Sequence, residues 1–190
     1  ITEDDQSVTY YVTDATAWWK EMNQLKEENV RDSLTGLLNR KGFHDGLESL
    51  FTCQEQLKHA AMIMLDADGL KLVNDIYGHH IGDDYLKRIA SALDERTRGR
   101  KLSARLGGDE FILFLYGYSA KIDLEQDIEK LRERRGECFL GESENVPVTL
   151  EFSMGYAFYP DDDRDYHVLM HLADQNMYEE KRKRKKWRRA

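Results

Sequence analysis

Two adjacent glycines, Gly107 and Gly108, constrain the fold of this chain more than any other feature. They separate two segments rich in apolar and aromatic residues, 101–106 and 110–116. Glycine adopts the positive φ angles that a tight turn between strands requires, and such a turn between two strand-like segments is typical of a β-hairpin. The sequence therefore predicts an antiparallel hairpin over residues 101–116.

The rest of the chain alternates between strand and helix patterns. Further strands are expected over residues 8–12, 60–65 and 146–159, the last as one strand or a pair. Helices are expected at about 16–30, 40–51, from near 82, 121–135 and 166–183, with a polar loop over 67–75. Alternating elements that include an antiparallel hairpin predict an α/β (α+β) fold with a mixed central sheet flanked by helices.

Charge is distributed unevenly along the 190 residues. Eight of the 28 basic residues lie in 181–189, whereas all 36 acidic residues lie at or before Glu180, so residues 1–180 carry a net charge of −16. An acidic body repels phosphates over its whole surface, which excludes a general nucleic-acid binder. The same carboxylates can hold divalent cations that attract phosphates. The basic end is interpreted either as a solvated helix end or as a contact for RNA or anionic lipid.

Cysteine content and hydropathy indicate a cytoplasmic protein. Cys53 and Cys138 are too few for a disulfide framework, which favours a reducing compartment. The longest apolar run, residues 60–65, is too short to cross a bilayer. We therefore expect a cytoplasmic chain with no membrane span of its own, and a larger sensor protein attached to a membrane is compatible with that expectation.

Two carboxylates stand where buried strands should end. Asp66 follows the apolar run 60–65, and Asp109 follows the glycine pair with Glu110 beside it. A carboxylate at the end of an apolar strand is costly unless a cation pairs with it, and a divalent metal also relieves repulsion between converging carboxylates. Taken alone, Asp66 is better explained as a residue that caps the next turn.

Four ordered motifs show a family resemblance. The segment Arg-Leu-Gly-Gly-Asp-Glu-Phe at 105–111 closely resembles the signature hairpin of the GGDEF family, the bacterial diguanylate cyclases. Segments 32–40, 66–83 and 173–181 resemble the other motifs of that family in the same order. This resemblance implies a GGDEF domain at 32–185, which leaves a basic tail at 186–190. Residues 8–16 separately resemble the end of a PAS domain joined to its signalling helix, so we expect the end of a sensor domain at 1–13 and a signalling helix at 14–31.

The resemblance implies a fold akin to polymerase palms and nucleotide cyclases, together with a reaction. Two GTP molecules would become cyclic di-GMP and two pyrophosphates across a homodimer, with Mg²⁺ or Mn²⁺ as cofactor, two ions per active site. By position, Asp66, the Ala67 carbonyl, Asp109 and Glu110 would bind metal. Asp109, Glu110 and Lys71 would be the catalytic residues.

The resemblance also implies the substrate-binding residues Gly69, Leu70, Lys71, Asn74, Asp83, Lys181 and Lys185. Asn74 and Asp83 would read guanine, because a carboxylate can accept both N1–H and N2–H₂ of that base. Asp83 before a helix is also a good N-cap. Where the family often has Gly-Arg after the final motif, this chain has Arg184-Lys185, which leaves the phosphate role of Lys185 in doubt.

A second departure concerns regulation. Many members carry an inhibitory product site, Arg-x-x-Asp, just before the glycine turn, and here Arg98 is followed by Lys101 at the acidic position. This difference predicts weak or absent inhibition by product through that site.

Rival functions are a non-catalytic receptor domain that binds GTP or cyclic di-GMP, and an enzyme making mixed cyclic AMP-GMP. The intact Gly-Gly-Asp-Glu turn argues against the first, and Asp83 argues against the second.

The N-terminal helix pattern suggests how the chain forms a dimer. Ala15, Trp18, Met22, Leu25 and Asn29 recur at the spacing of a coiled-coil seam, although a helix packed on its own domain shows the same pattern. We expect a homodimer formed through the GGDEF domains and this helix, with a sensor domain upstream.

Overall fold

The structure is a computed structural model that describes residues 30–53, 57–95, 97–141 and 145–187. The strand predicted at 8–12 and the seam predicted within 15–29 lie outside these residues. The elements, in chain order, are α2 (Arg40–Thr52), β1 (His59–Ala67), α3 (Leu70–Tyr77), α4 (His79–Asp94), β2 (Arg100–Gly107), β3 (Glu110–Tyr118), α5 (Lys121–Arg132), β4 (Gly136–Leu140), β5 (Val146–Leu150), β6 (Phe152–Tyr159) and α6 (Tyr166–Trp187). No helix in the described ranges is long and apolar enough to span a membrane.

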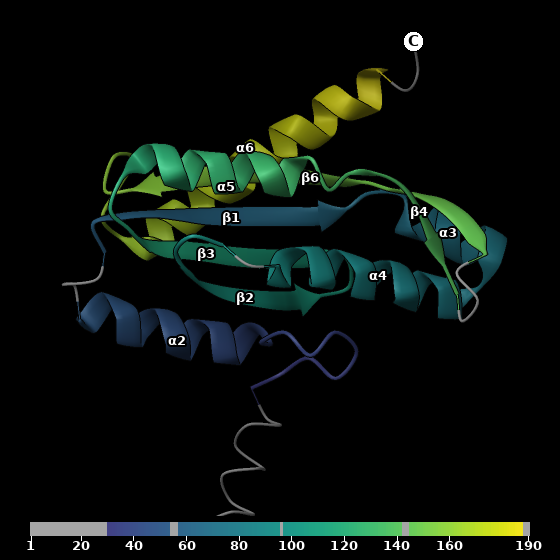
Figure 1. The fold of residues 1–190 in the computed structure, drawn as a ribbon, viewed down its shortest axis with the longest axis horizontal. Helices are drawn as coiled ribbons and strands as arrows, with labels where there is room; N and C mark the ends of the chain where they lie inside the picture. Colours follow the sequence, from purple (N-terminus) through teal and green to yellow (C-terminus); the bar gives the residue numbers. More distant parts are fainter. Residues whose placement is uncertain (1–29, 54–56, 96, 142–144, 188–190) are drawn as a thin grey trace, which may run out of the picture.

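A four-stranded sheet in the order β2-β3-β1-β6 forms the centre of the domain, and β4 and β5 form a separate hairpin (Figure 1). The predicted α+β architecture is confirmed. Each pairing between named strands is antiparallel, and the parallel component among the described residues is an isolated bridge between Leu38 and Ala104. The sheet is therefore mixed only through that bridge.

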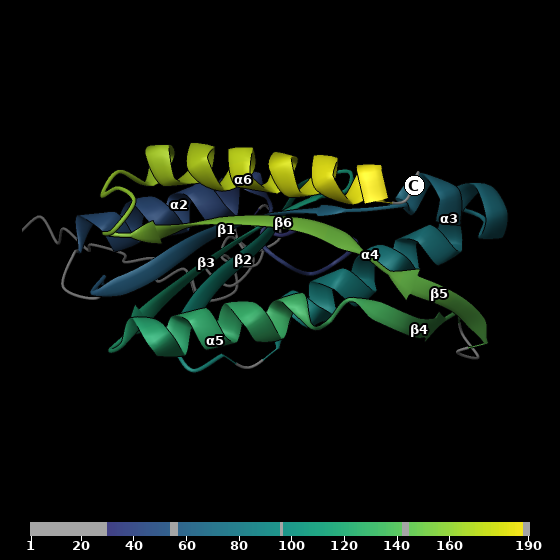
Figure 2. The ribbon, with the colours of Figure 1, turned by 90° about the horizontal axis from the view of Figure 1, so that it is seen from above.

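Helices cover both faces of the central sheet, with α2 and α6 on one side and α4 and α5 on the other (Figure 2). The side chains of β1 alternate between these two layers. Met62 and Met64 join the cluster that contains α2 and α6, whereas Ile63 and Leu65 join the cluster with α4 and α5. Burial on both faces explains why this strand appears in the sequence as a continuous apolar run.

The predicted hairpin is confirmed: β2 and β3 pair on either side of Gly107 and Gly108. The loop predicted over 67–75 is wrong, because α3 begins at Leu70. This helix was missed because its apolar side chains are divided: Leu70 and Val73 pack against the core, while Leu72 and Ile76 are exposed.

Other predicted boundaries also change. α4 begins at His79 rather than near 82, because Gly78, with φ of 86°, ends α3 and starts α4. α5 ends at Arg132, so the last predicted residues of that helix are not part of it. β4 was not predicted, since its five residues alternate exposed and partly buried positions without a strong apolar pattern.

At Gly155 of β6 the backbone of α6 approaches the sheet closely. A Cβ atom built there would lie 1.9 Å from the backbone nitrogen of Met177 and 2.4 Å from the carbonyl oxygen of Ala173. Backbone atoms cannot move aside as a flexible side chain can, so only glycine fits at this position.

We expect Gly155→Ala to lower the free energy of unfolding by about 3 kcal/mol, because the added methyl group forces α6 away from the sheet. Urea denaturation measures the change. Gly46→Ala on α2 is the matched control. The three atoms nearest to its Cβ would all belong to the flexible side chain of Leu102, the first at 3.0 Å, and alanine stabilises a helix by up to about 1 kcal/mol relative to glycine. Equal stability of the two variants would contradict the proposed contact.

Candidate active site

The site begins with the register between β1 and β3. Asp66 pairs with Glu110 across the two strands, and the Ala67 amide donates a hydrogen bond of 2.8 Å to the backbone carbonyl of Asp109. This register brings the end of the buried strand to the glycine turn. Asp66 is 7% exposed, whereas Glu110 points into solvent at the start of its strand.

α6 brings a cation to this point. The ammonium group of Lys181 donates a hydrogen bond of 2.5 Å to Oδ1 of Asp66. Burial raises the pKa of Asp66, the hydrogen bond from Lys181 lowers it, and the negative charges of Asp109 and Asp68 raise it further, so the net shift is upward. Burial lowers the pKa of Lys181, but the hydrogen bond to Asp66 and the three carboxylates outweigh burial and raise it. Lys181 thus lies within the electrostatic reach of three carboxylates, those of Asp66, Asp68 and Asp109.

Asp68 fixes the segment between β1 and α3. Its carboxylate accepts a hydrogen bond of 2.8 Å from Ser153 Oγ on β6, and its amide donates one of 2.9 Å to the carbonyl of Glu151. The Tyr85 hydroxyl lies 2.8 Å from the Asp68 carbonyl. No role was predicted for Asp68 from the sequence. The available signal was a second acidic residue two positions after Asp66, which in an extended strand faces the same side.

The donor set suits a hard divalent cation. Carboxylate oxygens of Asp66 and Asp109 and the backbone carbonyl of Ala67 are the ligand types that Mg²⁺ and Mn²⁺ prefer. In the described ranges, no three His, Cys, Asp or Glu side chains are close enough to form a metal cluster by themselves. A cation at this point would therefore depend on the two aspartates, the carbonyl oxygen and oxygens of a bound ligand.

Asn74 and Asp83 lie on adjacent helices, close to the same point. A Cβ atom at Gly82 would lie 1.8 Å from Oδ1 of Asn74, which places the Asn74 side chain directly against the residue that precedes Asp83. That Oδ1 atom is buried and has no hydrogen-bond partner among the described residues. Asp83 is exposed in the second turn of α4, so the N-cap interpretation of this residue is wrong.

The other predicted substrate-binding residues are more dispersed. Gly69 is the N-cap of α3 with φ of 81°, and Leu70 after it is half-buried. Lys71 and Lys185 are exposed on α3 and α6. The structure thus brings Lys181 to the carboxylate pair and leaves Lys71 and Lys185 facing solvent.

An ion pair braces the glycine turn. Arg105 donates hydrogen bonds of 2.8 and 3.1 Å to the carbonyl of Gly108, and its guanidinium lies 3.3 Å from Oδ1 of Asp32. The same oxygen of Asp32 accepts hydrogen bonds from the Thr35 amide and hydroxyl. The turn over residues 32–36 therefore holds the hairpin tip that carries Asp109.

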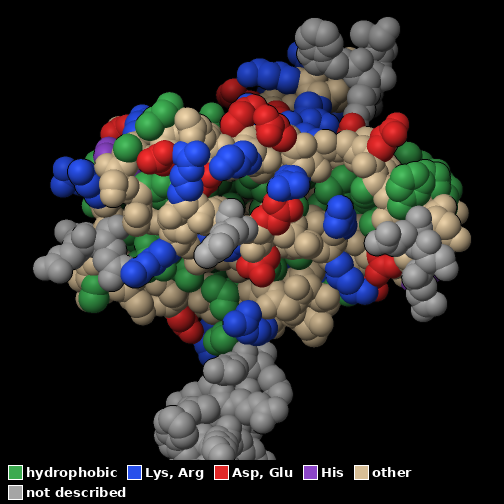
Figure 3. Space-filling view, in the orientation of Figure 1, with side chains coloured by type: hydrophobic (Ala, Val, Ile, Leu, Met, Phe, Trp, Pro, Cys, Tyr) green, Lys and Arg blue, Asp and Glu red, His purple; other side chains and the backbone are tan. Residues whose placement is uncertain are grey.

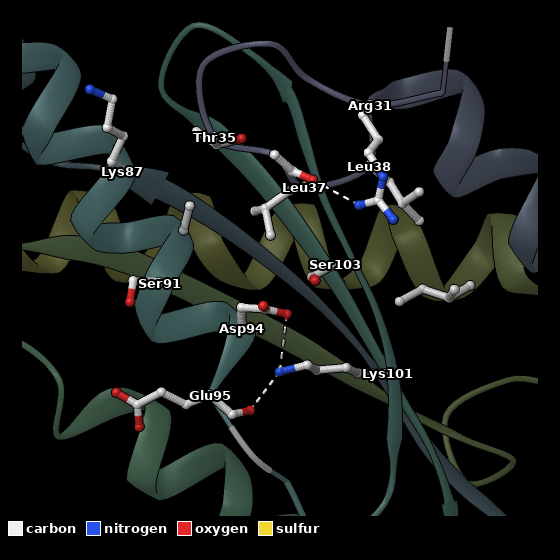
Figure 4. A pocket seen from close by; sticks show the side chains of 13 residues that line it. Arg31, Thr35, Leu37, Leu38, Lys87, Ser91, Asp94, Glu95, Lys101 and Ser103 are labelled. Atoms are coloured by element: carbon white, nitrogen blue, oxygen red, sulfur yellow. Dashed lines mark hydrogen bonds and ion pairs between the residues drawn. The ribbon is translucent and has the colours of Figure 1, made fainter. Parts of the chain in front are cut away.

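The side chains of Arg98 and Lys101 form hydrogen bonds with other residues of the domain. Lys101 Nζ donates hydrogen bonds of 3.0 and 2.5 Å to the carbonyls of Leu93 and Glu95 at the end of α4. It also lies 3.6 Å from Oδ1 of Asp94, and Figure 4 shows the contacts with Asp94 and Glu95. Arg98 donates hydrogen bonds of 2.5 Å to Asp123 and Gln126 of α5. Lysine at this position thus caps a helix, which is consistent with the predicted loss of the product site.

A groove of about 770 Å³ lies beside Lys101, between α4, β2 and residues 31–38 (Figure 4). None of its lining residues belongs to the predicted catalytic, substrate or metal set. The chemistry indicated by the sequence therefore lies outside this groove.

Comparison with known proteins identifies a family and several relatives. The family model described as "Diguanylate cyclase, GGDEF domain" matches residues 29–186. The chain is 34% identical over 176 residues to "Diguanylate cyclase DgcP" of Escherichia coli K12, and 36% identical over 162 residues to "Diguanylate cyclase DgcN" of the same strain. These matches cover 87% and 85% of this chain but 50% and 39% of the relatives. The chain thus spans half or less of their length.

Solved structures agree with this match. The coiled coil and GGDEF domain of DgcB from Caulobacter crescentus, in complex with c-di-GMP, gives a TM-score of 0.75 at 26% identity and covers 88% of each chain. The GGDEF domain of TpbB (YfiN) from Pseudomonas aeruginosa gives a TM-score of 0.69 at 31% identity, over 80% of this chain and 89% of that one.

The ion pair between Asp32 and Arg105 should make the free energy of unfolding depend on pH. Burial raises the pKa of Asp32, but hydrogen bonds from Thr35 and the charge of Arg105 outweigh burial and lower it. A lowered folded-state pKa contributes stability that is present above the unfolded-state value of about 3.9 and is lost as the pH falls through the folded-state pKa. We expect Asp32→Asn to cost about 1 kcal/mol at pH 7, and the cost to shrink below about pH 4.

Urea denaturation at a series of pH values measures this effect. Asp45→Asn, at an exposed position of α2, is the control and should follow the wild-type curve. If Asp32→Asn and wild type differed by the same free energy at every pH, the ion pair would not be linked to folding.

Proposed function

The chain belongs to the GGDEF domain family, and from that premise we propose that it is a diguanylate cyclase that condenses two GTP molecules into cyclic di-GMP and two pyrophosphates. The observation that carries the proposal is the convergence of Asp66, Asp68 and Asp109 on Lys181 and Arg184, three carboxylates against two cations. In the balanced reaction, each ribose 3′-oxygen forms a bond to the α-phosphorus of the other nucleotide. Each α-phosphorus loses pyrophosphate, and the two hydroxyl protons are released.

In this proposal Asp66, Asp109 and the Ala67 carbonyl hold Mg²⁺ or Mn²⁺, two ions per site, with Glu110 as a further ligand or a proton acceptor. When bound, the cations neutralise triphosphate charge and make the attacking hydroxyl more acidic. The paired Asp66 and Lys181 suit this role, because the same carboxylate already requires a cation in the free protein.

Several groups are placed to bind the triphosphate. Gly69 caps α3 without a side chain that bonds to the first backbone amides of the helix, and a helix N-terminus attracts anions. Lys181 stands at Asp66, and Lys71 is in the first turn of α3. We assign all three to phosphate binding, with Leu70 as the apolar wall beside them.

Asn74 and Asp83 are assigned to guanine. The buried Oδ1 of Asn74 without a partner in the described structure supports this assignment, since a buried acceptor gains most from a bound donor. Adenine offers no N1–H or N2–H₂ to Asp83, so ATP would leave that carboxylate unpaired.

The reaction requires a homodimer, because one protomer holds one nucleotide and ring closure needs two. On α3, Leu72 is 62% exposed and Ile76 is 59% exposed, and this apolar surface beside the assigned nucleotide residues supports a face that meets the second protomer. We retain the helix at 14–31 as a second dimer contact and 1–13 as the end of a sensor domain, in a cytoplasmic protein.

The direct test is to incubate the purified chain with GTP and Mg²⁺ and to identify the nucleotides by mass. The proposal requires cyclic di-GMP with two pyrophosphates released per product, and little product from ATP. GTP binding without turnover would contradict it and would favour the receptor function.

We expect Asp109→Asn and Asp66→Asn each to lower cyclic di-GMP formation by about 100-fold or more, because a neutral amide is a poor ligand for Mg²⁺. The initial rate at saturating GTP measures the loss, and circular dichroism checks that the fold is retained. Asp45→Asn outside the site is the control. A rate within about twofold of wild type for Asp109→Asn would remove this residue from the site, since loss of a group acting in the transition state costs far more.

A further inference from the structure

α6 presents two cations, not one, to the segment between β1 and α3. Lys181 contacts Asp66, and Arg184, one helical turn later, lies 3.5 Å from Oδ2 of Asp68 through its Nε atom. Residues three apart in a helix share a face, so both side chains point toward the same acidic segment. Lys185 is exposed on the same helix (Figure 3 shows the basic side chains at this projecting end).

The contacts of Arg184 are ion pairs without good hydrogen-bond geometry. Its Nη2 atom lies 3.5 Å from Oε1 of Glu151, and both distances exceed the usual 2.7–3.2 Å of an N–H···O bond. The Nε atom is buried and has no hydrogen-bond partner among the described residues. The guanidinium is thus held in place by charge while at least one of its donors is unused.

A neighbouring arginine shows the contrast. Arg135 donates a hydrogen bond of 2.8 Å to Glu180 and lies over the ring of Phe152, 4.8 Å from its centroid. The Nε atom of Arg135 is also buried without a hydrogen-bond partner among the described residues, so the two arginines differ in the hydrogen bond to Glu180 and in the ring contact, not at Nε. Arg184, with a side chain 24% exposed, has neither kind of contact in the described structure.

Arg184 also lies near the N-terminus of α3, where no described side chain accepts hydrogen bonds from the first backbone amides. Asp68, which it contacts, directly precedes the N-cap Gly69. Backbone amides at a helix N-terminus and a guanidinium with an unused donor together form a site for a phosphate group. Two independent features, on α3 and on α6, therefore point to the same anion.

We propose that Arg184 binds the triphosphate of GTP and replaces Lys185 in this role. The inference rests on the proposed function, because it names a residue of the same site. A phosphate can accept two short charge-assisted hydrogen bonds from the guanidinium, in place of its two contacts of 3.5 Å with carboxylates. The ammonium group of Lys185 cannot form this planar pair of hydrogen bonds.

The experiment measures binding rather than turnover. The first probe is 3′-deoxy-GTP, which lacks the attacking hydroxyl and whose binding is measured by calorimetry with Mg²⁺. The second probe is guanosine, which lacks phosphate and whose binding is measured by NMR titration. We expect Arg184→Gln to weaken 3′-deoxy-GTP about tenfold and to leave guanosine unchanged, since one charge-assisted contact is lost. Lys185→Gln, which removes the same charge from the next residue, should change neither affinity by more than about twofold.

Each other outcome overturns the inference. Unchanged affinity of Arg184→Gln for 3′-deoxy-GTP, equal weakening of both probes, or a larger loss in Lys185→Gln would show that Arg184 is structural. Arg184→Lys keeps the charge and is expected to bind about threefold more weakly than wild type, so it replaces Arg184→Gln if that variant unfolds. If wild type bound no 3′-deoxy-GTP, the proposed function would fail as well, whereas wild-type binding with an unaffected Arg184→Gln would remove the inference alone.

Discussion

The burial of one carboxylate organises this site. Asp66 stands at the end of a strand covered on both faces, where an unpaired charge would be costly, and Lys181 meets it at 2.5 Å. The β1–β3 register then adds Asp109, and the turn into α3 adds Asp68, so three carboxylates face two cations of α6, Lys181 and Arg184. Buried negative charge in excess of its counter-ions is what a cation-dependent nucleotide site requires before its ligands arrive.

The packing of α6 determines which cations reach these carboxylates. Gly155 permits the backbone of α6 to approach β6 closely at Met177, one turn before Lys181. Lys181 and Arg184 then follow on the side of the helix that faces Asp66 and Asp68. On the opposite edge, Asp32 and Arg105 hold the glycine turn from below. The close packing of α6 at Gly155 thus positions Lys181 and Arg184, and the Asp32–Arg105 ion pair positions the turn that carries Asp109.

The sequence predicted the parts of the fold that depend on local pattern. The glycine turn and the apolar strand before Asp66 carry strong local signals, and both are where they were expected. α3 was missed because its apolar residues are split between core and solvent, and β4 because five residues with one fully buried side chain give no period. Local pattern is weakest where an element has little of its own surface to bury.

Within the site, the sequence indicated Asp66, Asp109 and Lys181 through the family resemblance, and the structure brings these three together. It did not indicate Asp68, Ser153 or Arg184, since their contacts join β6 and α6 to a segment more than 80 residues away. Such pairings depend on the sheet order, which no local pattern contains.

Whether negative charge exceeds its counter-ions at this site is reported by the pKa of Asp66 in the metal-free protein, which ¹³C NMR titration of its carboxyl group measures. The account requires a value above the ordinary aspartate value of about 3.9, and a lower value in Asp109→Asn, where one repelling charge is removed. A wild-type pKa below the ordinary value that did not change in Asp109→Asn would mean that Lys181 alone satisfies this carboxylate. The excess of negative charge on which the site depends would then not exist.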